Sequence, residues 1–178
     1  MDLRNVLLEI HAALRDAGVQ HALIGGLALA AYGAARATVD LDLLAEGTRD
    51  ADIDTIVRGR GYMCLQRNEN VANYLSSDPA RGRIDFLFAR RVRGLAILAR
   101  ARAFEVLGQQ IRVVDAADLT GLKVQAYAND PGRRNQDLAD IQRLLHAGTP
   151  DLARVREYFR PFDCEKDLEA LLSSDVPR

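Results

Sequence analysis

The chain has 178 residues and a net charge of −1, and 48% of its residues are hydrophobic and 28% charged. These values suit one globular domain with room for a small appended subdomain, and they exclude a disordered chain. No apolar run approaches the roughly 20 residues that span a bilayer, and the N-terminal stretch carries acids where a signal peptide carries bases. We therefore expect a cytoplasmic protein that makes no membrane contact.

The first part of the chain mixes predicted helices and strands. Apolar residues at helical spacing predict a helix over 3–17, which Gly18 ends. An apolar run over 21–24 followed by Gly25 and Gly26 predicts a strand that enters a tight turn. The same criteria predict helices over 27–32, 50–60 and 91–100 and strands over 39–45, 62–66, 71–76, 83–89, 104–107 and 110–114.

After Asp115 the pattern is helical throughout. Helices are predicted over 116–128, 134–146, 151–160 and 163–173, with breaks at prolines and glycines. The sequence therefore predicts an α+β core over residues 1–114, with a mixed sheet flanked by helices. A helical C-terminal subdomain over 115–178 is expected to pack on this core. The cysteines and histidines have no metal-binding spacing, so we expect two reduced thiols and no zinc site.

Charges of opposite sign gather in two segments. Residues 37–55 contain six acids and one arginine, whereas residues 81–102 contain seven arginines and one acid, Asp85. An acidic centre beside a basic stretch can bind cations and phosphates together. A solvated surface of mixed sign is the alternative, and it needs no ligand.

Three aspartates are candidate metal ligands. Asp40 and Asp42 lie two residues apart on a predicted strand, so both point to one face about 6–7 Å apart, while Leu41 points to the core. Like charges side by side repel each other unless a cation such as Mg²⁺ bridges them. Asp85 lies on a later strand and completes a three-carboxylate cluster if the two strands are neighbours. Solvated acids, with Asp85 paired to Arg83 or Arg81, are the alternative.

Two further groups of residues suit a nucleotide. Gly25 and Gly26 join a strand to a helix, where backbone N–H groups can approach a phosphate, although a plain turn explains them equally well. Arg36 and Thr38 precede the acidic strand and would offer a triphosphate a cation and a hydroxyl.

Charged residues also face inward in the helical part. Lys123 lies on an apolar helix stripe, Asp137 points inward from the next helix, and Asp140 lies at the boundary of its apolar face. Buried charges need partners, so a structural Lys123–Asp137 ion pair between two helices is one interpretation.

Taken together, these motifs resemble the polymerase-β-type nucleotidyltransferase superfamily. Gly25-Gly26, a helix, Arg36-x-Thr38-x-Asp40-Leu-Asp42 and a later single aspartate follow the order of that family. The segments 119–126 and 134–145 extend the resemblance to the AbiEii-type toxin nucleotidyltransferases of bacterial toxin–antitoxin systems. Many members have Gly-Ser where this chain has Gly25-Gly26, so phosphate contact would rest on backbone N–H groups alone.

The resemblance implies a Mg²⁺-dependent enzyme that moves a nucleoside monophosphate from an NTP to an acceptor hydroxyl of RNA or protein. Asp40, Asp42 and Asp85 would bind two Mg²⁺ ions, for which Mn²⁺ can substitute, and Lys123 would contact phosphates with support from Asp137. A cognate antitoxin is the implied partner. An antibiotic-modifying nucleotidyltransferase and a non-catalytic nucleotide- or partner-binding member are the alternatives.

Overall fold

The computed structural model describes residues 2–148 and 150–173. The chain divides into two compact units: residues up to 31 together with 36–114 form the first, and residues 32–35 together with those after Val114 form the second. No helix in the described part of the chain is long and apolar enough to cross a membrane. Cys64 and Cys164 are free thiols, as the sequence predicts.

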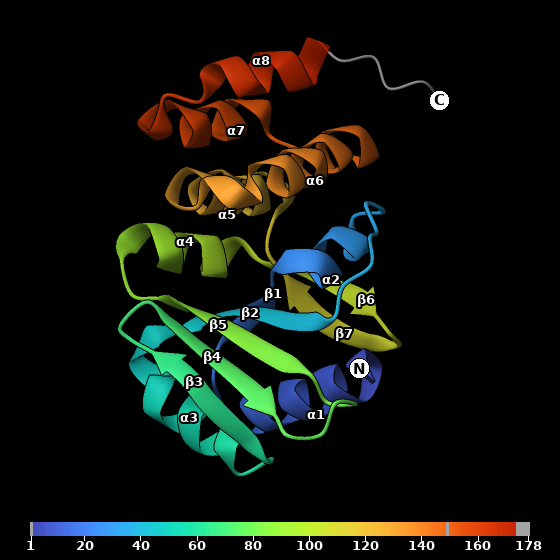
Figure 1. The fold of residues 1–178 in the computed structure, drawn as a ribbon, viewed down its shortest axis with the longest axis vertical. Helices are drawn as coiled ribbons and strands as arrows, with labels where there is room; N and C mark the ends of the chain where they lie inside the picture. Colours follow the sequence, from blue (N-terminus) through green and yellow to red (C-terminus); the bar gives the residue numbers. More distant parts are fainter. Residues whose placement is uncertain (1, 149, 174–178) are drawn as a thin grey trace. The chain divides into compact units, whose positions relative to one another are not determined.

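The first unit contains a mixed sheet with the strand order β3-β4-β5-β2-β1-β7-β6 (Figure 1). β2 runs parallel to β5 and β1 runs parallel to β7, whereas the other neighbours are antiparallel. The predicted α+β fold is therefore confirmed. The strand bounds are β1 His21–Leu23, β2 Asp40–Glu46, β3 Tyr62–Arg67, β4 Val71–Ser76, β5 Arg83–Ala89, β6 Arg102–Val106 and β7 Gln109–Val113.

Helices cover both faces of this sheet. α1 and α3 lie on one face, and α2 and α4 lie on the other (Figure 1). α1 forms where the sequence predicts because its apolar residues share one stripe, which the fold buries. The Asp2 carboxylate caps the start of α1 by accepting a hydrogen bond from the backbone N–H of Asn5. The bounds are α1 Leu3–Asp16, α2 Gly25–Ala31, α3 Asp50–Arg58 and α4 Val92–Arg100.

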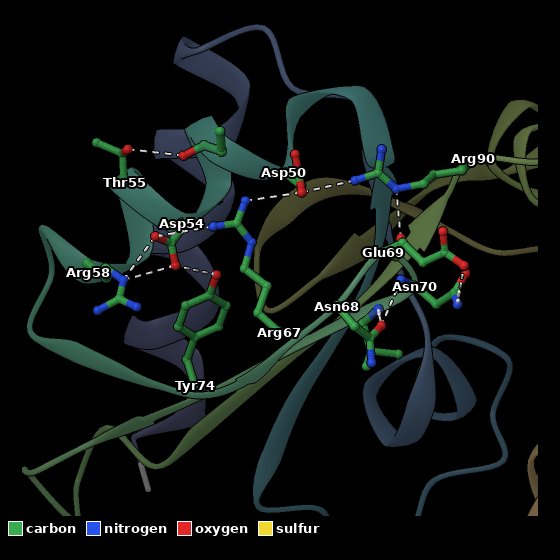
Figure 2. Close-up of polar contacts among 12 residues, drawn as sticks. Asp50, Asp54, Thr55, Arg58, Arg67, Asn68, Glu69, Asn70, Tyr74 and Arg90 are labelled. Atoms are coloured by element: carbon green, nitrogen blue, oxygen red, sulfur yellow. Dashed lines mark hydrogen bonds and ion pairs between the residues drawn. The ribbon is translucent and has the colours of Figure 1, made fainter.

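A polar network fixes α3 to the sheet (Figure 2). Asp54 of α3 accepts hydrogen bonds from Nε of Arg58, at 3.0 and 2.9 Å, and from the Tyr74 hydroxyl of β4, at 3.0 Å. Arg67 of β3 contacts both Asp50 and Asp54. Each carboxylate of this network is therefore balanced by an arginine, and the network holds the acids of α3 against the edge of the sheet.

The second unit is helical, as predicted. Its helices bury a common apolar core that includes Val124, Ile141 and Phe159. Gly121 of α5 lies against the ring of Tyr158, because a Cβ added at Gly121 would come within 2.3 Å of that ring. The bounds are α5 Ala116–Asn129, α6 Arg134–Ala147, α7 Leu152–Phe159 and α8 Glu165–Ser173.

Several elements begin or end one or two residues from their predicted bounds, and two of these differences reflect local backbone geometry. α2 includes the glycine pair that was expected to precede it, because Gly25 has a φ of +65° and turns the chain straight into the helix. β6 begins at Arg102, two residues earlier than expected, and its hairpin turns at Leu107 and Gly108, both with positive φ. Such a turn matches the twist of the two strands, which lets them pair along their whole length.

Candidate functional site

The acids of β2 and β5 lie side by side on one face of the sheet. β2 and β5 are neighbouring parallel strands, and Asp42 is directly opposite Asp85. Along β2, Leu41 and Leu43 are fully buried while Asp40 and Asp42 are partly exposed. The alternation expected from the sequence is therefore confirmed, and the strands are neighbours as the three-carboxylate hypothesis requires.

Asp85 is held by two hydrogen-bond donors on the same face. Nε of Arg83 lies 2.7 and 2.9 Å from the two carboxylate oxygens, and Nδ2 of Asn73 donates to Oδ1 at 2.7 Å. Asn73 lies opposite Asp85 on the antiparallel neighbour β4. Asn73 was not among the predicted site residues, because its signal in the sequence is only that of a polar residue inside a largely apolar strand.

The glycine pair lies against the acidic strand. A Cβ added at Gly25 would lie 2.0 Å from Oδ2 of Asp42, and one added at Gly26 would lie 2.6 Å from Cβ of Thr38. The backbone N–H of Ile24 also donates to the carbonyl oxygen of Asp42 at 3.1 Å. Both glycines are therefore required by close packing against β2 and the loop before it, which the sequence did not reveal.

Arg36 and Thr38, on the loop before β2, each donate a hydrogen bond to a nearby backbone carbonyl. The Thr38 hydroxyl donates to the carbonyl oxygen of Asp40 at 3.4 Å, and Nη1 of Arg36 donates to the carbonyl oxygen of Ala37 at 2.9 Å. Thr38 thus lies between the glycine pair and the start of the acidic strand. The structure places Gly25, Gly26, Thr38 and Asp42 together.

The chemistry of this group of side chains fits a hard cation. Carboxylate oxygens are the ligands that Mg²⁺ prefers, and a positive charge already lies among these acids in the guanidinium of Arg83. The hydrogen bond to Asp85, together with the charges of Asp85, Asp40 and Asp42, raises the pKa of Arg83. Within residues 2–148 and 150–173, however, no three acidic, histidine or cysteine side chains converge as metal ligands. The three-carboxylate metal site therefore stays a prediction.

The structure does not support direct phosphate contact by Lys123. Its ammonium is buried and donates to Oδ1 of Asp137 at 3.1 Å and to Oδ2 of Asp140 at 2.6 Å. Arg133 and Arg143 contact the remaining oxygens of the two acids. Both hydrogen bonds tie α5 to α6, so the geometry favours the ion-pair interpretation. The physical reason is burial, since an ammonium removed from water needs carboxylate partners.

The position expected for Asp140 is also corrected. It was placed at the boundary of the apolar face of its helix, yet it is fully buried and provides the shortest contact to Lys123. Helical periodicity missed this because the lysine draws the carboxylate into the interior. Asp137, which was expected to face inward, is buried as predicted.

The arginines of residues 81–102 are partly used to neutralise acids. Arg81 contacts Glu9, Arg83 contacts Asp85, and Arg90 contacts Asp50 (Figure 2). Of these three pairs, only Arg90–Asp50 joins the basic segment to the acidic segment of residues 37–55. These pairs leave a smaller basic surface than the charge count suggests.

Comparisons with known proteins agree with this fold. Three solved structures are similar: the antibiotic-resistance factor ANT(2'')-Ia, the lincosamide antibiotic adenylyltransferase LnuA, and an antigenic nucleotidyltransferase-like protein from Paracoccidioides brasiliensis. ANT(2'')-Ia is 15% identical over 96% of this chain and 97% of its own, with a TM-score of 0.71. LnuA is 12% identical over 81% and 97%, with a TM-score of 0.60. The Paracoccidioides protein is 13% identical over 99% and 94%, also at 0.60.

The sequence itself identifies the family. A search of curated protein sequences finds no match. The family model of the nucleotidyl transferase AbiEii toxin of type IV toxin–antitoxin systems matches residues 7–175, which is nearly the whole chain. This chain therefore belongs to the AbiEii nucleotidyl transferase toxin family.

Proposed function

We propose that this nucleotidyltransferase moves a nucleoside monophosphate from an NTP to an acceptor hydroxyl and releases pyrophosphate. One observation carries the proposal: Asp42 and Asp85 lie opposite each other on neighbouring parallel strands, with the Gly25 backbone packed against Asp42. This arrangement gathers carboxylate oxygens beside a glycine turn, in a chain of the AbiEii family.

Asp40, Asp42 and Asp85 are the residues that would hold Mg²⁺, or Mn²⁺ in its place. When bound, such ions neutralise the negative charge of the triphosphate and of its leaving pyrophosphate. The donor set suits them because every side-chain ligand is a carboxylate oxygen.

The protein's own residues contribute position and proton transfer. Asp85 accepts the proton of the acceptor hydroxyl, whose oxygen forms a bond to the α-phosphorus as the bond to the bridging oxygen of pyrophosphate breaks. Backbone N–H groups of Gly25 and Gly26 bind the phosphates. Thr38 and Arg36, on the loop before β2, offer a hydroxyl and a cation to the same triphosphate.

We propose RNA or protein as the acceptor, and membership of a toxin family of type IV toxin–antitoxin systems supports a cognate antitoxin as partner. A second candidate is an antibiotic acceptor, because a structure of ANT(2'')-Ia in complex with adenylyl-2''-tobramycin matches 93% of this chain with a TM-score of 0.71. Transfer tested on total RNA, on protein and on aminoglycosides distinguishes these acceptors. A member that only binds nucleotide would show metal-dependent NTP binding without transfer.

Removing the β2 carboxylates tests the nucleotide site. Mg²⁺ with an NTP at about 100 times its dissociation constant is expected to stabilise the protein by about 2.7 kcal/mol, or by about 5–10 °C in melting temperature for this size. Asp40→Asn combined with Asp42→Asn is expected to abolish that gain, because the ion loses its ligands. Differential scanning fluorimetry measures both proteins.

A matched control removes the same charge elsewhere. Asp16 and Asp52 are exposed and pair only with surface arginines in the contacts that the structure describes, so Asp16→Asn with Asp52→Asn should keep the full metal–NTP shift. An equal shift in the Asp40–Asp42 double variant would remove these residues from the site.

A further inference from the structure

The side chain of Arg83 lies among the acids proposed to hold the metal. It is the first residue of β5 and lies opposite Asp40 of β2. Nε contacts both oxygens of Asp85, at 2.7 and 2.9 Å. This position makes Arg83 a direct competitor for the oxygens that a metal ion would use.

The charge of Arg83 is permanent under ordinary conditions, since a guanidinium does not deprotonate in proteins. A neighbouring positive charge lowers the affinity of a carboxylate cluster for a cation, by repulsion and by occupying lone pairs. Asn73 fixes the orientation of the same carboxylate from β4. Asp85 is therefore already satisfied by hydrogen bonds in the arrangement that the structure describes.

The Arg83 side chain is free enough to be exchanged. It is 42% exposed, whereas the Asp85 side chain is 23% exposed. A long, partly exposed arginine side chain can change rotamer towards water at little cost in free energy, because an ion pair that is open to solvent contributes little stability. A metal–triphosphate complex brings a cation that competes with Arg83 for Asp85, and it brings phosphate oxygens that can bind the guanidinium in turn.

We propose that Arg83 is an internal counter-ion, which the metal–NTP complex displaces from Asp85 and which then binds the triphosphate. This inference rests on the proposed function and adds a positioning residue to it. Before the nucleotide binds, Arg83 neutralises the clustered acids. After it binds, the ion takes over that role, and the guanidinium offers a planar pair of donors to phosphate oxygens.

The proposal predicts opposite effects on the ion and on the nucleotide. In Arg83→Gln, Mn²⁺ without nucleotide is expected to bind at least about tenfold more tightly, which corresponds to about 1.4 kcal/mol. In the presence of Mn²⁺, the same variant is expected to bind the NTP more weakly than the wild type does, because the guanidinium that would bind the triphosphate is missing. Electron paramagnetic resonance of free Mn²⁺ and calorimetric titration of the NTP give the two affinities for the full chain.

Arg58 provides a matched control. Its Nε contacts both oxygens of Asp54 at 3.0 and 2.9 Å, which is the same geometry (Figure 2). Asp54 lies on α3, which covers the face of the sheet opposite to α2 (Figure 1). Arg58→Gln removes the same charge and should leave both affinities as in the wild type. Arg83→Lys keeps the charge without the planar fork and should bind free Mn²⁺ with intermediate affinity. It also serves as the test if circular dichroism shows that Arg83→Gln does not fold.

The outcomes separate the inference from the proposed function. If the wild type binds Mn²⁺ and replacement of Arg83 leaves that affinity unchanged or lowers it, the inference about Arg83 is wrong and the proposed nucleotidyl transfer is unaffected. If neither the wild type nor any variant binds Mn²⁺, with or without an NTP, both are wrong. If Arg58→Gln also binds Mn²⁺ more tightly, the gain in affinity comes from the more negative net charge of the protein and not from the position of Arg83, and the inference is again wrong.

Discussion

Lys123→Met is expected to lower the free energy of unfolding by about 3–5 kcal/mol, because it leaves buried carboxylates without their cation. The Lys123 ammonium is the shared donor to Asp137 and Asp140, both of which are almost fully buried. The two arginines that contact these acids have largely exposed side chains and compensate only in part. Chemical denaturation monitored by circular dichroism measures the loss.

Two further variants define the origin of this effect. Lys166 is exposed on α8 and is the only other lysine, so Lys166→Met should change the free energy of unfolding by less than about 0.5 kcal/mol. Adding Asp137→Leu and Asp140→Leu to Lys123→Met should restore most of the loss, since an apolar replacement of a buried ion pair is often tolerated. A fully stable single variant with weakened NTP binding would instead return Lys123 to the nucleotide site.

The second large effect is a loss of stability in acid that depends on His21. Its ring is buried, with Nδ1 2.8 Å from the carbonyl oxygen of Val19 and Nε2 2.8 Å from Nδ1 of His11. A carbonyl oxygen only accepts, so Nδ1 of neutral His21 carries the proton and Nε2 accepts from His11. Burial lowers the pKa of His21 from 6.5 to about 4.

The direction of the pH dependence follows from this shift. Between pH 6.5 and about 4 the unfolded chain binds the proton and the folded protein does not, so stability present above pH 6.5 decreases as the pH falls. A shift of this size corresponds to about 3 kcal/mol, complete near pH 4. The quantity to measure is the difference in free energy of unfolding between wild type and His21→Gln, from pH 7.5 to 4.5.

The difference isolates His21 from the carboxylates that titrate in the same range. It should shrink by up to about 3 kcal/mol on acidification, because every other titratable group is common to both proteins and cancels in the difference. A difference for His21 that does not change with pH would show that the folded protein protonates this ring as readily as the unfolded chain does.

The fold could be predicted largely because the signals for it are local. Alternation along 40–45 and 83–89 gave the buried and open faces of β2 and β5, and the apolar stripe of α1 gave its core side. The pairing of the strands could not be derived, because the partners are far apart in the sequence. β1 pairs with β7, which lies near the other end of the unit, and β2 pairs in parallel with β5, two strands further along the chain than its sequence neighbour β3. Such long-range contacts leave no periodic trace in a sequence.

The acids and glycines of the candidate site were predicted from the sequence, and an arginine partner for Asp85 was an open alternative, but Asn73 was not foreseen. Asp42 and Asp85 were proposed as neighbours, and their register agrees with that proposal. Asn73 could not be derived, because its position opposite Asp85 depends on the register between β4 and β5, which alternation alone does not fix. The Arg83–Asp85 pair, in contrast, was an alternative that the sequence left open, because residues two apart on a strand share a face. The role of Lys123 could not be decided from the sequence, because a lysine on an apolar helix face suits a phosphate site and a buried ion pair equally well. Its contacts with Asp137 and Asp140 favour the ion pair.

Transfer of labelled nucleotide tests the central claim most directly. The wild type, Asp42→Asn, Asp85→Asn and the control Asp52→Asn are each incubated with Mg²⁺, a cell extract and each of the four α-³²P-labelled NTPs. The expected result is label attached to RNA or protein by the wild type and Asp52→Asn, with background levels from Asp42→Asn and Asp85→Asn. Undiminished labelling by either site variant, or labelling by the wild type that persists after Mg²⁺ is chelated, would contradict metal-dependent transfer on these carboxylates.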